Sequence, residues 1–159
     1  DELDEAIVEY MKQHFALRVG EQTAEQLKIE IGSAFPLDQE LTTEVSGLDT
    51  ISSVPRKAVV TSEEIREALR EPLEAILIAI RGVIEQCQPE LAADIVDTGM
   101  VLTGGGSILR GLDRLMNEQL GVPVRVAEDP LTTVARGTSI CLEHLSQWRD
   151  ALEDGDSDL

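Results

Sequence analysis

The spacing of apolar residues changes several times along this chain, and each spacing predicts an element. Apolar positions recur at helical intervals over residues 3–17, which predicts an amphipathic helix that ends near Gly20. Thr23 and Gln26 have the spacing of a capping box for a second helix. Gly32 is a natural end for that helix, because glycine is favoured just beyond helix C-termini. The start of the chain therefore predicts two helices.

The pattern changes to that of short strands between residues 36 and 60. Segments 40–45 and 57–60 have the composition of β-strands, and polar turn residues at 46–47 and 52–53 connect them. This region predicts a small α+β lobe.

A long apolar stripe at helical spacing follows, from Thr61 to Cys87. Thr61 and Glu64 have the spacing of a capping box, which marks the start of this helix. Pro72 predicts a kink or a restart, because proline lacks the N–H that an interior helical position needs. The breadth of the stripe is typical of a helix packed against a sheet.

The last part of the chain predicts alternating strands and helices, with strands at 100–103 and 122–126 and helices at 107–119 and 133–147. A helix between the two strands predicts that they run parallel. Three glycines, 104–106, connect the first strand to its helix. Glycines lack the Cβ atoms that keep a ligand from the backbone, and a helix start offers unpaired N–H groups, so this turn suits a nucleotide. A glycine run alone also fits a tight turn with no ligand.

Composition narrows the class of protein. The 159 residues fit one domain or two small lobes, and 42% apolar residues are enough for a core. A net charge of −18 argues against nucleic-acid binding through a basic face and against adsorption to an anionic membrane. No apolar run approaches the roughly 20 residues of a membrane span. Five acidic residues crowd positions 150–159, which predicts a disordered acidic tail.

Few residues of catalytic or metal-binding type stand out. His14 and His144 lie in helical patterns, and Cys87 and Cys141 lie far apart in apolar helical contexts, which is typical of buried free thiols. No local spacing predicts a metal site or a Ser/His/Asp triad. The chain begins with Asp1 rather than methionine, which suggests a fragment. The residues alone predict an acidic cytosolic α/β domain with a glycine turn that can face a nucleotide.

Three segments resemble the MreB-type bacterial actins, in the order in which that family has them. Residues 20–34 read GEQTAEQLKIEIGSA, residues 101–113 read VLTGGGSILRGLD, and residues 126–137 read VAEDPLTTVARG. The resemblance extends over nearly the whole chain before the acidic tail.

The resemblance implies an α/β fold that is half of an actin/heat-shock-chaperone-type ATPase. Its ribonuclease H-like core lobe, subdomain IIA, corresponds to residues 1–20 and 61–149, and a small inserted α+β lobe, subdomain IIB, corresponds to residues 21–60. Residues 150–159 remain as the acidic tail.

The resemblance also implies a nucleotide site in a full-length parent that binds ATP with Mg²⁺. Glu25 can accept hydrogen bonds from ribose hydroxyls, and Lys28 lies on the same helical face; an exposed ion pair between them is the alternative. An apolar side chain at Ile108 would cover the base. The positions implied to bind the nucleotide are Glu25, Gln26, Leu27, Lys28, Gly104, Gly105, Gly106, Ser107 and Ile108.

Both phosphate loops and the water-positioning residues of the family lie upstream of the matched segments. No catalytic residue and no metal ligand is therefore expected in this chain, and the chain alone is expected not to hydrolyse ATP.

The function that the resemblance implies is that of a cytoskeletal filament protein, which sets cell shape by organising cell-wall synthesis. Its partners would be copies of itself, head to tail, and the cell-wall elongation machinery. It would be cytoplasmic and membrane-associated, with no membrane segment in this chain. Two alternatives stay open: a fragment of a sugar-kinase-like phosphotransferase, and a stand-alone interaction module without nucleotide chemistry. The sequence upstream of Asp1 distinguishes them, because a GG-containing phosphate turn supports the filament protein and a start codon supports the module.

Overall fold

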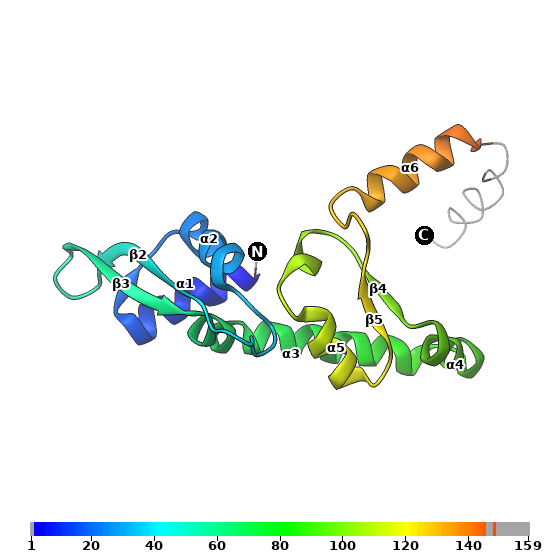
Figure 1. Ribbon diagram of the computed structural model, residues 1–159, viewed down its shortest axis with the longest axis horizontal. Coiled ribbons are helices and arrows are strands. Elements are labelled where there is room, and N and C mark those ends of the chain that lie inside the picture. The colour runs from blue at the N-terminus through cyan, green and yellow to red at the C-terminus, as the bar shows by residue number, and fades with distance from the viewer. Residues whose placement is uncertain (1, 146–147, 149–159) are drawn as a thin grey trace.

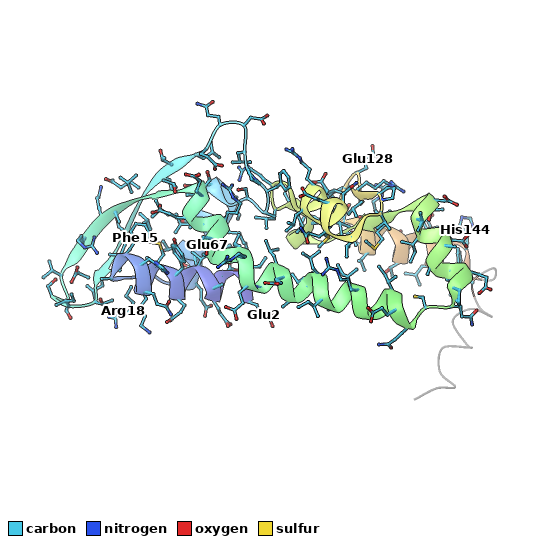
Figure 2. The ribbon with its side chains drawn as sticks, turned by 90° about the horizontal axis from the view of Figure 1, so that it is seen from below. Glu2, Phe15, Arg18, Glu67, Glu128 and His144 are labelled. Carbon is cyan, nitrogen blue, oxygen red and sulfur yellow. The ribbon has the colours of Figure 1, made fainter. Side chains whose placement is uncertain are left out.

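The computed structural model describes residues 2–145 and residue 148, and one long helix, α3, connects two groups of elements in it (Figure 1). The elements are α1 (Glu2–Phe15), β1 (Leu17–Arg18), α2 (Glu21–Ile31), β2 (Thr42–Asp49), β3 (Pro55–Thr61), α3 (Ser62–Gln86), α4 (Pro89–Thr98), β4 (Met100–Leu102), the 3₁₀ turn η1 (Gly105–Ile108), α5 (Leu112–Leu120), β5 (Val124–Val126) and α6 (Thr133–Glu143). The first group holds α1, α2 and β1 to β3, and the second holds α4, α5, β4 and β5. Figure 2 shows α3 running along both groups from a second direction.

The first helix is shorter than predicted. α1 ends at Phe15 rather than near Gly20, because Ala16 has a positive φ of 48° that a helix cannot contain. Leu17 is fully buried, but it belongs to strand β1. The predicted capping box of Thr23 is also wrong. α2 begins at Glu21 with Gly20 at its N-cap, and it ends before Gly32 as predicted.

Strands β1, β2 and β3 form an antiparallel sheet in that order. Ser46 and Gly47 do not form the predicted turn, since they lie inside β2 opposite Lys57 and Arg56. Glycine is required there, because a Cβ at Gly47 would lie 2.7 Å from the carbonyl oxygen of Arg18 on β1. The absence of a side chain therefore lets β1 pair with β2.

The turn between β2 and β3 follows Asp49. Its carboxylate Oδ1 accepts hydrogen bonds from the backbone N–H of Ile51 (3.0 Å) and of Ser52 (2.9 Å). These bonds lower the pKa of the Asp49 carboxyl to about 2, and the bond from Ser52 contributes most. The predicted turn at 52–53 is confirmed, and it is held by a charged side chain.

α3 begins with the predicted capping box of Thr61 and Glu64. It continues through Pro72 as a single helix, so the predicted restart does not occur. Leu69 and Leu73, on either side of Pro72, are almost completely buried. The face of α3 that carries these leucines packs against both groups of elements. This packing offsets the backbone hydrogen bond that Pro72 cannot donate, so tertiary contacts override the local preference of proline.

β4 and β5 pair in parallel, as predicted, with Met100 opposite Val124. The predicted helix over 107–119 is wrong in its first part. Four residues after Gly104 form the 3₁₀ turn η1, and α5 starts only at Leu112. Gly111 separates the two with a φ of 72°, which interrupts the right-handed helix.

A continuous apolar core joins α1, α2, the first sheet, α3 and α5. By contrast, α6 has no buried residue and projects away from the other elements in Figure 1. The predicted helix end near residue 147 and the acidic tail at 150–159 lie outside the described residues. Within the described part of the chain, no helix is long and apolar enough to cross a membrane.

Candidate functional site

A cavity of about 320 Å³ lies between α2, the start of α1 and the glycine turn that follows β4. Its volume is at the lower end of the range for small-molecule sites, which is roughly 300–1,000 Å³. The cavity is lined by Leu3, Lys28, Ile29, Gly105, Gly106, Ile108, Leu109 and Arg110. Segments that are far apart in the sequence therefore meet at one concave site.

The glycine turn is held by its own backbone and by the loop before α6. Gly104 has a φ of 83°, which only glycine adopts readily, and its N–H donates to the carbonyl of Pro130 at 2.8 Å. The Ser107 hydroxyl donates back to the carbonyl of Gly104 at 2.7 Å. Because η1 is a single turn, the long helix start that was expected directly behind the glycines is not there.

Gly105 and Gly106 leave open space beside the cavity. A Cβ at Gly106 would have no neighbour within 4 Å, and one at Gly105 would meet only Leu131 Cδ2, at the ordinary contact distance of 3.8 Å. The fold of this chain therefore does not itself require glycine at these two positions. Their lack of side chains leaves the backbone accessible to a ligand.

Lys28 forms an ion pair with Asp4 at the edge of the cavity. Its ammonium Nζ lies 2.8 Å from Asp4 Oδ1 and 3.0 Å from Oδ2. Both side chains are mostly buried, with 17% of Lys28 and 9% of Asp4 exposed. The partner in this pair is a residue of α1, rather than Glu25 on the same helix. The pair fixes the Lys28 ammonium at the edge of the cavity.

Four of the nine predicted site residues meet at the cavity, namely Lys28, Gly105, Gly106 and Ile108. Ile108 is half exposed there, as a side chain that covers a ligand should be. The α2 segment and the glycine segment, predicted to act together, are brought together by the fold.

The other five do not line this cavity. Leu27 is part of the core, and the buried Ser107 hydroxyl is used within the turn. Gln26 lines a separate cavity against β2, and Glu25 is exposed on α2. Gly104 supplies the backbone geometry of the turn.

Sequence reasoning missed five residues at this site: Leu3, Asp4, Ile29, Leu109 and Arg110. One signal for Asp4 was available, because it is a carboxylate on the apolar face of α1 and is buried with that face. Arg110 lies within the segment 101–113 that carries the family resemblance. No local signal distinguished Leu3, Ile29 and Leu109 from other apolar residues of the chain.

The segment from Ser33 to Leu41 ties α2 to α3. Arg66 on α3 donates to Ser33 Oγ at 2.7 Å and to Glu40 Oε1 at 2.7 Å. The Ser62 hydroxyl donates to the same carboxylate. The hydrogen bond from Arg66, and then that from Ser62, lower the pKa of the Glu40 carboxyl. This network holds the end of α2 in place.

The cavity combines apolar side chains with a cationic edge. Leu3 and Ile29 come from the helices and Ile108 from the turn, so a flat apolar group between them would be removed from water. Arg110 adds positive charge and hydrogen-bond donors, and the Lys28 ammonium lies at the same cavity in its ion pair with Asp4. This combination suits a ligand with an aromatic ring and anionic groups. In the described residues, no group of three or more His, Cys, Asp and Glu side chains is placed to hold a metal ion.

A family model and the curated relatives both match this chain to the MreB/Mbl proteins. The family model described as MreB/Mbl protein matches residues 1–150. The cell shape-determining protein MreB of Escherichia coli K12 is 53% identical to this chain over 143 residues, which are 90% of this chain and 41% of that protein. The chain thus spans about two fifths of the length of this curated relative.

Solved structures show the same likeness. The structure of MreB5 of Spiroplasma citri bound to AMPPNP has a TM-score of 0.88 and 31% sequence identity, and the match covers 96% of this chain and 45% of that one. The double helical filament of MamK has a TM-score of 0.65 and 22% identity, over 81% of this chain and 39% of that one. At this level of identity, the likeness to MamK shows a shared fold and nothing further.

Proposed function

This chain belongs to the MreB/Mbl family of actin-like, cell shape-determining proteins, and from this premise we propose that it forms the nucleoside side of an ATP cleft in a filament protein. The predicted fold class is confirmed, because the described residues form an α/β structure with open sheets, and 96% of this chain matches MreB5. Membership of this family favours a filament protein over the alternative of a sugar-kinase-like phosphotransferase.

The observation that carries the proposal is the cavity between α2 and the glycine turn. It brings together Lys28, Gly105, Gly106 and Ile108, four of the positions that the family resemblance implies to bind the nucleotide. MreB5, the solved relative, binds the nucleotide AMPPNP. The open space beside the glycines and the apolar side chains around the cavity fit the same class of ligand.

Each residue has a role in this proposal that follows from its chemistry. Ile29 and Ile108 cover the faces of the base, and Lys28 donates to the ribose or to a phosphate oxygen. Glu25, exposed on the same helix, accepts from ribose hydroxyls. The glycine backbone lies against the nucleotide, because no side chain separates them. Bound Mg²⁺ would supply charge neutralisation at the phosphates, which lie beyond this side of the cleft.

The rest of the cleft would come from a longer protein that contains this chain. α6 buries no side chain, and Val134 and Leu142 on it are largely exposed. Val101 on β4 is also half exposed, in a parallel sheet of only two strands. Parallel strands are normally covered on both faces, so these surfaces fit a second half of the domain. We assign residues 1–20 and 61–149 to the core lobe and 21–60 to the small lobe.

Self-association fits the family and the shape of the small lobe. The hairpin of β2 and β3 projects from the end of the molecule in Figure 1 and carries Ile51, whose side chain is 88% exposed. A head-to-tail contact at such an end generates an open filament rather than a closed ring. MamK, which shares the fold, was solved as a double helical filament. The filament would act in the cytoplasm at the membrane, with the cell-wall elongation machinery as its partner.

The nucleotide site is tested by Gly105→Asp in the longer protein that carries this chain. A side chain at Gly105 is tolerated by the fold, so the variant should remain folded. It should lose ATP binding in calorimetric titration, because the carboxylate fills the space of the ligand and repels its phosphates. Gly20→Asp is the matched control, since it adds the same charge at an exposed helix N-cap where aspartate is favoured.

Loss of binding in Gly105→Asp, with binding kept in Gly20→Asp, supports the site. Unchanged affinity in a folded Gly105→Asp variant would mean that the glycine run is only a tight turn.

A further inference from the structure

Arg110 spans the two segments that form the cavity. It follows the glycine turn, and its guanidinium Nη1 donates to the carbonyl of Ile29 at 2.8 Å and to the carbonyl of Gly32 at 3.2 Å. Both acceptors belong to the C-terminal end of α2, where carbonyls lack partners within the helix. A cation at a helix C-terminus also interacts favourably with the helix dipole.

The backbone of Arg110 makes a second connection to the same region. Its carbonyl accepts a hydrogen bond of 2.7 Å from the N–H of Ala34, and residues Ser33 and Arg110 form an isolated parallel bridge. The chain just after α2 is therefore attached to the chain just after the glycine turn. Arg110 is the residue at which main-chain and side-chain attachments coincide.

The attachment lies at one end of the cavity. Lys28 and Ile29 line the cavity from α2, and Gly106 and Ile108 line it from the turn. Ile29 is also the residue whose carbonyl Arg110 binds. The Arg110 side chain therefore connects the two sides of the cavity.

We infer that Arg110 is a positioning residue, which sets the gap between α2 and the glycine turn and thereby the affinity for the nucleoside part of a bound nucleotide. This inference rests on the proposed nucleotide site. In this role Arg110 acts through the backbone of α2 and of the turn, which its side chain and its carbonyl connect.

The chain offers a matched control for this role in Arg81. Its guanidinium Nη2 donates to the carbonyl of Gln119 at 2.8 Å, in the last turn of α5. Arg81 and Arg110 thus make the same kind of contact, from an arginine to a helix C-terminus. Only Arg110 is at the nucleoside cavity.

The experiment compares Arg110→Gln, Arg110→Lys and Arg81→Gln in the longer protein that carries this chain. Calorimetry measures ATP affinity, thermal unfolding without nucleotide measures stability, and hydrogen exchange measures the amides of residues 28–32 and 105–109. Arg110→Gln and Arg81→Gln should lower the unfolding temperature by similar amounts, because each loses a contact at a helix end.

Only Arg110→Gln should weaken ATP binding, by about tenfold, which is the scale of one lost hydrogen bond from a charged group. It should also accelerate exchange in both segments. Arg110→Lys should retain part of the affinity, because a single nitrogen makes both side-chain contacts in the structure.

Unchanged ATP affinity in folded Arg110→Gln overturns the inference, as does an equal loss of affinity in Arg81→Gln. Failure of the unsubstituted protein to bind ATP overturns the proposed function instead. In that case the exchange measurement still decides whether Arg110 links the two segments, since unchanged exchange in Arg110→Gln excludes the link.

Discussion

Replacing Gly111 by alanine should destabilise this chain much more than the same replacement at Gly121. The two glycines flank α5 and have nearly the same backbone conformation, with φ and ψ of 72° and 12° at Gly111 and of 70° and 19° at Gly121. The conformational penalty of alanine is therefore nearly equal at the two positions. What differs is the space for the new Cβ atom.

At Gly121 a Cβ would have no neighbour within 4 Å, whereas at Gly111 it would lie 2.7 Å from the Cβ of Phe35. Carbon atoms pack best at about 3.5–4 Å, so the contact is about 1 Å too short. Phe35 cannot relieve it by rotating its side chain, because its Cβ is fixed to the backbone. The guanidinium of Arg114 lies 4.5 Å from the centre of the Phe35 ring and restrains it further.

The expected loss of stability is the sum of a penalty for the left-handed backbone conformation and a penalty for the close contact with Phe35. A left-handed conformation costs a residue other than glycine about 1–2 kcal/mol, and this is all that Gly121→Ala should lose. Overpacking costs about 1–3 kcal/mol more, so Gly111→Ala should lose about 2–5 kcal/mol in total. Part of each loss is offset in the unfolded state, where alanine has less conformational freedom than glycine.

Urea denaturation followed by circular dichroism measures both free energies of unfolding, provided that the denaturant dependence is the same for both variants. The comparison with Gly121→Ala removes the backbone penalty and the unfolded-state effect together. A difference between the variants of less than about 0.5 kcal/mol, the usual scale of neutral surface substitutions, would refute the packing argument.

Two further predictions concern the β2–β3 hairpin. Asp49→Asn should lower stability at neutral pH, and the difference from the unsubstituted chain should shrink as the pH falls from about 4, the ordinary value of an aspartate, toward 2. The sign follows because hydrogen bonds from Ser52 and Ile51 lower the pKa of this carboxyl to about 2, so their contribution is lost on protonation. Urea denaturation at a series of pH values measures this, and a difference that is independent of pH would argue against it. Ile51→Asp should reduce sedimentable polymer of the longer protein without lowering its unfolding temperature, because the exposed side chain has no structural role in the turn; normal pelleting would exclude a polymer contact at this tip.

Local features of the sequence predicted the elements whose causes are themselves local. The capping box of Thr61 and Glu64 is formed as expected, because all its atoms lie within four residues. The parallel pairing of β4 and β5 follows from the intervening helix. Two predictions failed where distant packing decided. At Pro72, buried neighbours on both sides keep α3 a single helix, so the predicted restart does not occur, and at Gly47 the neighbouring strand β1 requires a glycine within β2.

By itself, the sequence determined the family, the alternation of elements and the two segments that form the candidate site. It placed Lys28 and the glycine run together because both lie in segments that resemble one family. The tertiary structure decided which residues of those segments face the cavity, and it added Asp4 and Arg110. Asp4 lies on α1 and pairs with α2, whereas Arg110 follows the glycine turn and binds the end of α2. Such contacts are set by how helices and turns pack in three dimensions, and the spacing of residues along one segment carries no information about a partner on another.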